Sequence, residues 1–165
     1  MSHLDIIQKK IYTVNSIHKT LAYWRFKQRK IVFTNGCFDI LHLGHITYLA
    51  KASDMGDELI IGLNSDESIK RLKGKNRPIN DQYSRQILLA AISFVSAVII
   101  FEEDTPLSLI QSIKPDILVK GADYIPENIV GYDFVKSYGG KIESVDLLDG
   151  YSTSNILNKI LENNI

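Results

Sequence analysis

Residues 34–45 read TNGCFDILHLGH, and this segment decides the fold because of the two elements that it connects. Before it lies the apolar, β-branched run Ile31-Val32-Phe33, which predicts a buried strand. After it, a helical pattern begins at about Leu43 and continues to about Ser53, ending near Gly56. A strand followed by a helix is the repeating unit of an α/β sheet.

The same alternation continues along the rest of the chain. Further strands are predicted at Leu59–Leu63, Ala97–Phe101, Ile117–Val119 and, more weakly, Lys141–Val145. Helices are predicted over 83–94, from Thr105-Pro106, before Gly139-Gly140 and from about Ser152. Short strands that are apolar on both faces and separated by helices predict a doubly wound parallel sheet. We therefore expect an α/β fold with a five-stranded sheet and helices on both faces.

The N-terminal region has its own pattern. Ile7, Ile11, Val14 and Leu21 recur at helical spacing, which predicts one amphipathic helix. A chain of 165 residues has room for one domain with a real core. We expect residues 1–28 to be an N-terminal helical extension and residues 29–165 to be the functional domain.

Composition and charge exclude several classes of function. The formal net charge is zero, which argues against a nucleic-acid-binding protein and against one held on an anionic membrane. The single cysteine, Cys37, excludes an internal disulfide and suits a reducing compartment. The first ten residues lack a signal-peptide core, and no apolar run is long enough to span a bilayer. We expect a cytoplasmic protein.

Segment 34–45 also carries the candidate chemistry. In a doubly wound sheet, ligands bind outside the carboxyl ends of the strands, where this segment lies. His42 and His45 are three residues apart at a predicted helix start, so both lie near free N–H groups and the positive helix end. Gly44 between them lets a ligand approach the backbone. The pattern indicates an anion site, and the alternatives are a metal-binding pair or two surface histidines.

The segment closely resembles the G-x-F-D-x-x-H-x-G-H signature of the cytidylyltransferase-like nucleotidylyltransferases. The resemblance extends over nearly the whole chain from Ile31 and implies a Rossmann-like sheet. It implies that His42 and His45 contact the triphosphate and stabilise the α-phosphorus during transfer. It also implies nucleotide contacts from Thr34, Asn35, Gly36, Cys37, Phe38 and Gly44. Because the position of Cys37 varies in the family, we expect no chemical role for its thiol.

A basic segment, residues 70–78, reads KRLKGKNRP and follows the second strand and a short helix. A solvated basic loop is the simpler interpretation, but in a neutral protein this run at the active-site edge indicates a mobile phosphate-binding loop. By resemblance, Lys73 is catalytic, together with the histidines. The expected acceptor-binding residues are Asp39, Asp66, Lys75, Arg77 and Arg85. Arg85 could instead be an ordinary helix-surface charge.

Two further segments complete the expected nucleotide site. Lys120-Gly121-Ala122-Asp123-Tyr124 follows the fourth strand, and Gly121, Asp123 and Tyr124 are expected to contact the nucleotide. The alternative for this segment is a turn capped by the aspartate. Tyr151, Ser152 and Thr153 open the last helix, where a serine is ordinarily only an N-cap. A second helix N-terminus directed at the pocket would equally bind phosphate.

Within the family, the chain most resembles the D-glycero-β-D-manno-heptose 1-phosphate adenylyltransferases of lipopolysaccharide biosynthesis. Shared stretches include Arg77-Pro78-Ile79-Asn80 and Leu118-Val119-Lys120-Gly121. The resemblance implies transfer of AMP from ATP to heptose 1-phosphate, giving ADP-heptose and pyrophosphate. It also implies Mg²⁺ bound mainly through the nucleotide phosphates, with no metal ligands from the protein, and a homodimer. A separate sugar kinase would supply the acceptor, because only the first helix precedes the domain.

Two alternatives remain. A cytidylyltransferase would use CTP with glycerol 3-phosphate or another small phosphorylated or phosphonate acceptor. Related glycerol-3-phosphate enzymes carry an arginine at the position of Leu147, which weakens this alternative. A nucleotide-binding module without catalysis is the other alternative, and the intact histidine and lysine motifs argue against it.

Overall fold

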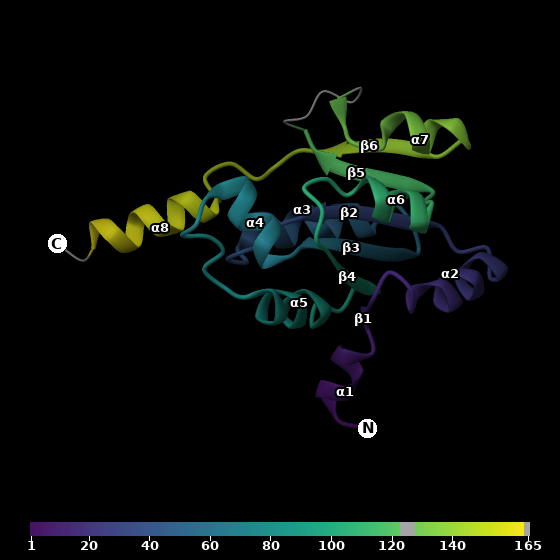
Figure 1. The fold of residues 1–165 in the computed structure, drawn as a ribbon, viewed down its shortest axis with the longest axis horizontal. Helices are drawn as coiled ribbons and strands as arrows, with labels where there is room; N and C mark the ends of the chain where they lie inside the picture. The colour runs from purple at the N-terminus through teal and green to yellow at the C-terminus, as the bar shows by residue number, and fades with distance from the viewer. Residues whose placement is uncertain (123–127, 164–165) are drawn as a thin grey trace.

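The structure is a computed structural model that describes residues 1–122 and 128–163. In chain order its elements (Figure 1) are α1 (His3–Gln8), β1 (Ile11–Tyr12), α2 (Ile17–Phe26), β2 (Ile31–Gly36), α3 (Leu43–Ser53), β3 (Glu58–Asn64), α4 (Asp66–Lys73), α5 (Gln82–Ala90), β4 (Ala97–Phe101), α6 (Leu107–Ile113), β5 (Ile117–Gly121), α7 (Tyr132–Ser137), β6 (Lys141–Val145) and α8 (Thr153–Glu162). The α/β class predicted from the alternating pattern is confirmed.

The sheet is parallel, and its strand order places a switch point beside β2. The described strands form one six-stranded sheet in the order β1-β4-β3-β2-β5-β6. From β2 the chain builds β3 and β4 on one side, then returns to add β5 and β6 on the other. In such a sheet a crevice opens at the carboxyl ends of the strands that flank the reversal, here β2 and β5.

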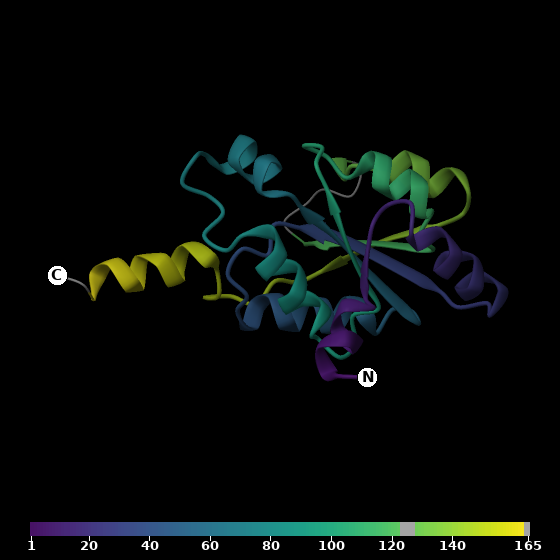
Figure 2. The same cartoon turned by 60° about the horizontal axis from the view of Figure 1, so that its bottom comes forward.

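Helices cover both faces of the sheet, as expected (Figure 2). On one face, α2, α6 and α7 pack onto a buried cluster that includes Phe33 and Ile60. On the other face, α3 and α5 pack onto a second cluster that includes Val32 and Ile61. Because successive residues of a strand point to opposite faces, both faces of the central strands are apolar.

The N-terminal prediction of one continuous helix is wrong. The segment forms α1, then the short strand β1, then α2, and β1 adds a sixth strand by pairing Ile11 with Val98 of β4. Thr13 and Ser16 exchange hydrogen bonds between side chain and backbone in both directions, which stabilises a turn before α2. Ile11 therefore serves the sheet, although its spacing from Ile7 suits a helix.

The last helix, α8, differs from the others because it projects away from the sheet (Figures 1 and 2). None of its residues is buried, and Leu161 is 67% exposed. Among the described residues, no helix is both long and apolar enough to cross a membrane.

Candidate functional site

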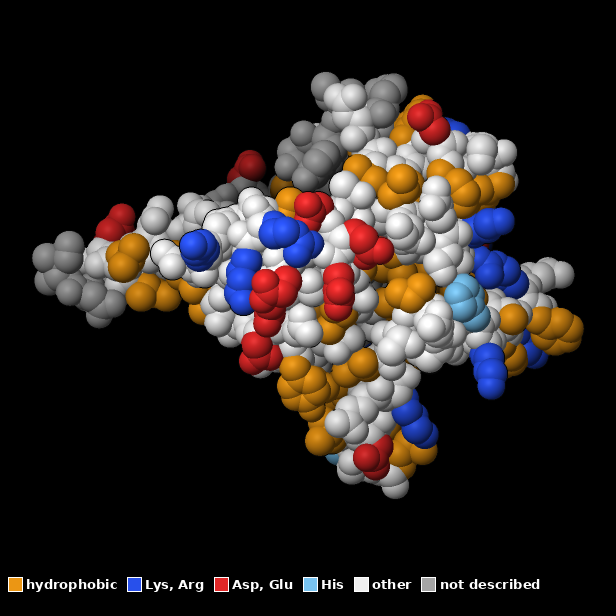
Figure 3. Space-filling model, viewed as in Figure 1, with side chains coloured by type: hydrophobic (Ala, Val, Ile, Leu, Met, Phe, Trp, Pro, Cys, Tyr) orange, Lys and Arg blue, Asp and Glu red, His pale blue; other side chains and the backbone are white. Residues whose placement is uncertain are grey.

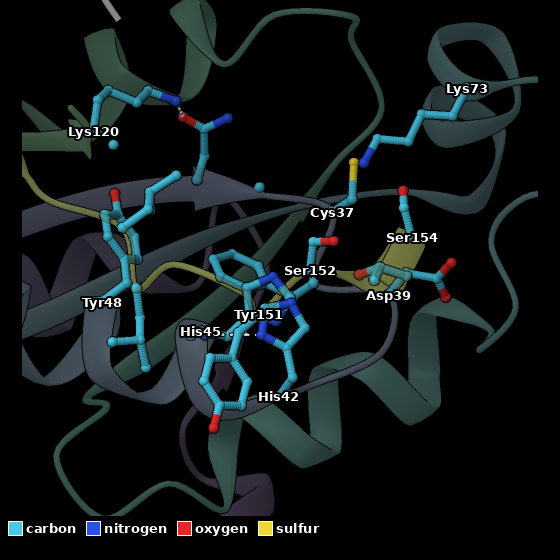
Figure 4. A pocket seen from close by; sticks show the side chains of 18 of the residues that line it. Cys37, Asp39, His42, His45, Tyr48, Lys73, Lys120, Tyr151, Ser152 and Ser154 are labelled. Carbon is cyan, nitrogen blue, oxygen red and sulfur yellow. Dashed lines mark hydrogen bonds between the residues drawn. The ribbon is translucent and has the colours of Figure 1, made fainter. Parts of the chain in front are cut away.

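A cavity of about 390 Å³ lies at the predicted switch point, outside the carboxyl ends of β2 and β5 (Figure 4). Its walls come from six places: the end of β2 with the segment that follows, the first turns of α3, the end of α4 with the loop that follows, the end of β5, the loop after β6, and the start of α8. The lining residues are Asn35, Gly36, Cys37, Phe38, Asp39, His42, Gly44, His45, Tyr48, Lys73, Arg77, Lys120, Gly121, Leu147, Leu148, Tyr151, Ser152, Thr153 and Ser154.

His42 and His45 lie at the start of α3 with their rings stacked, the centroids 3.8 Å apart and the planes 23° apart. His42 is the N-cap of α3, and its Nδ1 accepts a hydrogen bond of 3.4 Å from the His45 backbone N–H. A neutral His42 ring that accepts at Nδ1 carries its proton on Nε2 and is therefore a donor there. His45 Nδ1 is buried and has no hydrogen-bond partner within the described chain. The pair thus offers imidazole nitrogens to a ligand.

The environment keeps both rings neutral. Burial, followed by the charge of the neighbouring His42, lowers the pKa of His45 to about 4. Burial also lowers the pKa of His42. At neutral pH both rings of the ligand-free protein are therefore neutral N–H donors, and the positive potential of the free site comes from the helix end and from lysines.

Close packing explains two residues of the signature. A Cβ on Gly44 would lie 3.0 Å from His42 Nδ1 and 3.2 Å from Tyr151 Cβ. The glycine therefore makes room for the histidine ring and Tyr151, a different reason from the ligand approach that the sequence suggested. Phe38 has a φ of 44°, in the left-handed region, and its ring meets His45 edge-on at 5.2 Å. A bulky residue in that conformation is strained, and such strain concentrates at functional sites.

The basic segment divides into an outward half and an inward half. Lys70 pairs with Glu67 at 2.7 Å, and Arg71 pairs with Asp104 at 2.7 Å. Figure 3 shows basic and acidic side chains mixed in the region of α4, so this outer face is close to neutral. Lys73 lines the cavity with Arg77, whereas Lys75 is exposed and outside the lining.

Asp39 is buried and already has partners. Its carboxylate accepts hydrogen bonds from the backbone N–H groups of Ile79 at 2.8 Å and Asn80 at 2.9 Å. It also forms an ion pair of 2.9 Å with Arg77. Asp39 lines the cavity, but its oxygens hold the loop that bears Arg77.

Three other predicted residues lie outside the lining. Arg85 is fully buried, so it is not a surface charge, and it does not reach the cavity as an acceptor contact; Asp66 binds it at 2.7 Å. Thr34 is also fully buried, and its hydroxyl is 2.7 Å from the hydroxyl of Tyr48. These three polar groups shape the site from behind its surface.

The second helix N-terminus reaches the cavity as the sequence suggested. Ser152 caps α8, its hydroxyl accepting from the Asn155 N–H at 3.1 Å, and Tyr151 and Thr153 also line the cavity. Gly121 lines it from the end of β5. Asp123 and Tyr124, the other predicted nucleotide contacts, lie outside the described residues.

The structure adds lining residues that the sequence analysis did not select. Lys120, from β5, contributes a cation whose Nζ bonds to Asn35 Oδ1. The sequence feature that could have identified Lys120 is its position directly after the predicted strand Ile117–Val119, beside Gly121. Leu147 and Leu148 form an apolar part of the wall, and Tyr48 lines the cavity from α3. The resemblance drew attention to Leu147 only as the position of a family arginine, and a leucine in a loop gives no further sequence signal for a binding site.

The described residues contain no group of three or more His, Cys, Asp or Glu side chains placed to hold a metal ion. The metal-pair interpretation of His42 and His45 thus finds no third ligand among these residues. The described lining instead has stacked neutral imidazoles, two helix N-termini and three cations, Lys73, Arg77 and Lys120. This arrangement suits an extended polyanion.

A parallel α/β sheet with a polyanion cavity at its switch point defines a nucleotide-binding fold. The chain belongs to the cytidylyltransferase-like family, whose model matches residues 33–157. The resemblance identified in the signature is thereby confirmed, and the chain is a nucleotidyltransferase domain.

Curated relatives include two proteins named bifunctional protein HldE. The one from Syntrophotalea carbinolica is 53% identical over 93% of this chain and 31% of its own length. The one from Campylobacter fetus subsp. fetus is 58% identical over 80% of this chain and 28% of its own length. The chain thus spans about a third of the length of these relatives.

Solved structures agree on the fold. The lipopolysaccharide core biosynthesis protein from Thermoplasma volcanium has a TM-score of 0.60 and 33% identity, covering 75% of this chain and 99% of that one. A pantoate-beta-alanine ligase from Francisella tularensis has a TM-score of 0.58, covering 92% of this chain and 77% of that one. At 20% identity, the ligase shows the fold alone.

Proposed function

We propose that this chain transfers AMP from ATP to a sugar 1-phosphate, heptose 1-phosphate, releasing pyrophosphate and forming ADP-heptose. The observation that carries the proposal is the convergence of two helix N-termini on one cavity, with the stacked His42–His45 pair at the first and Ser152 at the second. Each helix end offers free N–H groups and positive partial charge to phosphate oxygens.

The reaction requires alignment and charge stabilisation from the protein. A phosphate monoester has a second pKa of about 6, so at neutral pH the acceptor is mostly a dianion and needs no general base. One acceptor oxygen forms the new bond to the α-phosphorus while the bond to the leaving pyrophosphate breaks. His42 and His45 would donate to the oxygens of the α-phosphate, with Lys73 on the pyrophosphate. The thiol of Cys37 has no role in these steps.

Nucleotidyltransferases of this kind generally use Mg²⁺. The carboxylate of the lining, Asp39, is occupied by Arg77 and two backbone N–H groups, and the described residues offer no metal cage. We propose that the ion enters as the metal–nucleotide complex, where it would neutralise phosphate charge. The residues of this chain then hold the complex through its phosphates.

Two observations favour a heptose acceptor and ATP over the cytidylyl alternative. The relatives named HldE are 53% and 58% identical in sequence to this chain over the matched residues. The similar Thermoplasma volcanium structure is a lipopolysaccharide core biosynthesis protein. Leu147, at the place where glycerol-3-phosphate cytidylyltransferases carry arginine, lines the cavity as an apolar wall. A base that meets leucine is bound by apolar contact instead of by a charged donor.

The proposed activity has consequences for partners. We propose that a sugar kinase, in a separate protein or a fused domain, supplies the sugar 1-phosphate. A homodimer and a cytoplasmic location are part of the same proposal, by analogy with the family.

The decisive experiment is a matrix of ATP, CTP, GTP and UTP against heptose 1-phosphate, glucose 1-phosphate and glycerol 3-phosphate, read by pyrophosphate release. We expect the highest kcat/KM for ATP with heptose 1-phosphate. Preference for CTP with glycerol 3-phosphate would establish the cytidylyl alternative. Nucleotide binding without pyrophosphate release from any pair would indicate a binding module.

A further inference from the structure

Arg85 is a fully buried cation whose three guanidinium nitrogens all have partners. Removing a guanidinium from water is costly unless the surrounding groups replace its hydration shell. Here three backbone carbonyl groups and one carboxylate do so. A site built so completely around one side chain indicates that the side chain holds its surroundings in place.

The four partners of Arg85 come from three separate segments of the chain. Nη1 donates to the carbonyl group of Cys37, which follows β2, at 2.7 Å, and to that of Asn64, the last residue of β3, at 2.9 Å. Nε donates to the carbonyl of Asn80 at 3.0 Å, and Nη2 to Asp66 Oδ1 at 2.7 Å, at the start of α4. One planar group therefore connects the signature segment to the segment that follows the basic loop.

Asp39 makes a second connection between the same two segments. Besides binding the N–H groups of Ile79 and Asn80 and the side chain of Arg77, it accepts at its own backbone oxygen from Asn80 Nδ2 at 2.7 Å. Asp39 thus binds both the backbone N–H and the side-chain amide of Asn80, and Arg85 binds its backbone carbonyl. Segment 77–80 is fixed against segment 36–39 from two sides.

The chain between α4 and Arg77 is held differently. Gly74 has a φ of 96°, with open space where a side chain would be, and residues 74–76 are exposed. In this turn the Gly74 N–H donates to the Lys70 carbonyl and the Arg77 N–H donates to the Gly74 carbonyl, and both hydrogen bonds are local. Within the basic segment, the turn at residues 74–76 is therefore the part most able to move.

We propose that Arg85 is a positioning residue that, with Asp39, latches segment 77–80 to the signature segment and so fixes Arg77 relative to His42 and His45. This inference rests on the proposed function for its effect on turnover, but not for its effect on the loop. Arg85 does not line the cavity. It acts by setting the geometry of groups that do, and small misplacements of such groups lower rates by as much as about a hundredfold.

The test is Arg85→Lys, which keeps the charge but cannot reach four partners in one plane. The matched control is Arg25→Lys. Arg25 also donates to two backbone carbonyl groups, of Ile113 and Lys114, at the opposite end of the molecule. Amide hydrogen exchange and steady-state kinetics with ATP and heptose 1-phosphate are measured for both variants and the wild type.

We expect amide exchange at Ile79 and Asn80 to become at least about tenfold faster in Arg85→Lys, with β3 unchanged. We expect kcat to fall at least about tenfold, with the Kd of a non-hydrolysable ATP analogue changed less than about threefold.

If Arg85→Lys does not fold, Asn80→Ala, which removes one bond of the latch, replaces it with the same expected directions. Unchanged exchange at both amides, or equal effects from Arg25→Lys, would overturn the proposal. A wild type that releases no pyrophosphate overturns only the proposed function, because exchange still tests the latch.

Discussion

The two helix N-termini that meet at the cavity are supported in opposite ways. The first turns of α3 are part of the core, with Gly44, Tyr48 and Leu49 all buried. α8 has an ordinary serine cap but no buried residue, and it projects from the sheet (Figure 1). Isolated helices of its length are marginal in water. One half of the proposed phosphate site is thus preformed, while the other half depends on additional contacts.

This difference suggests how the site works. In the proposed transfer, a preformed α3 terminus with stacked imidazoles would need no rearrangement when charge develops at the α-phosphorus, which is where preorganisation is most effective. A weakly supported α8 can open for substrates and close on phosphates, and elements that move are drawn from the least stable parts of a fold. We expect nucleotide to order α8 and the turn at residues 74–76, and to leave α3 unchanged.

The largest expected effect tests the preformed half. His42→Asn and His45→Asn should each lower kcat at least about a hundredfold, because the shorter asparagine amide does not reach the position of the imidazole Nε2 that donates to developing phosphate charge. Asparagine at position 42 retains a capping side chain, so the start of α3 is preserved and the effect is separated from folding. Steady-state kinetics and circular dichroism measure both properties. If both variants retained more than about a tenth of the activity, the histidines would not stabilise the transition state.

The next effect compares protection by nucleotide in the two halves. Trypsin should cleave the free protein after Lys73, Lys75 and, in α8, Lys159, and spare Lys51 in α3. ATP with Mg²⁺ should slow cleavage at the first three sites at least about tenfold. No cleavage is expected after Arg77, which precedes a proline and is held by Asp39.

Mass spectrometry of the fragments identifies each site, and UTP at the same concentration is the control. Equal cleavage with and without ATP would mean that the basic segment is an ordinary solvated loop and that α8 does not close on the nucleotide.

A smaller effect is expected from the cap of α8. Ser152→Ala removes the acceptor for the Asn155 N–H and should weaken the helix start by about 1 kcal/mol, equivalent to about fivefold in ATP affinity if closure of α8 is coupled to binding. The matched control is Ser2→Ala, because Ser2 caps α1 in the same way, accepting from the Asp5 N–H at 3.1 Å. Isothermal titration measures both variants. Equal affinities would show that α8 does not close on the nucleotide.

The comparison also shows what the sequence could predict. The strands from Ile31 onward and the position of the cavity followed from apolar runs and the sheet rule, and the structure confirms both. These features have short-range signals. β1 was missed because its two residues gain their stability from pairing with β4, far along the chain. Pairing at a distance leaves no periodic pattern in a two-residue strand.

The predicted roles of Arg85 and Thr34 show a second limit. Motif and loop position placed both residues at the site, but not whether they face the ligand or lie behind it. Thr34 is turned to Tyr48, and Arg85 is turned to three backbone carbonyl groups and Asp66. Burial of a polar side chain depends on partners from distant segments, which a single motif does not contain. That Leu147 and Leu148 line the cavity likewise depends on how distant segments pack together.

The smallest expected effect is on the pH dependence of ATP affinity. In the free protein, burial and the charge of His42 lower the pKa of His45 to about 4, and burial lowers that of His42. A bound triphosphate brings several negative charges to contact distance, and these outweigh about half a unit of positive charge at the helix end. We therefore expect nucleotide binding to raise the pKa of at least one ring.

A pKa raised in the complex means that a proton is taken up on binding, so ATP should bind more tightly as pH falls from about 8 toward about 6.5. The expected gain is about threefold, because the terminal ionisation of the triphosphate opposes it and both rings start from lowered pKa values. The His42→Asn, His45→Asn double variant isolates the ligand's own contribution and should lose the gain. NMR titration of the imidazoles with and without a non-reactive ATP analogue measures the pKa values directly. Unchanged or lowered values for both rings would mean that the histidines remain neutral donors throughout, with Lys73, Lys120 and the bound metal–nucleotide complex supplying the positive charge.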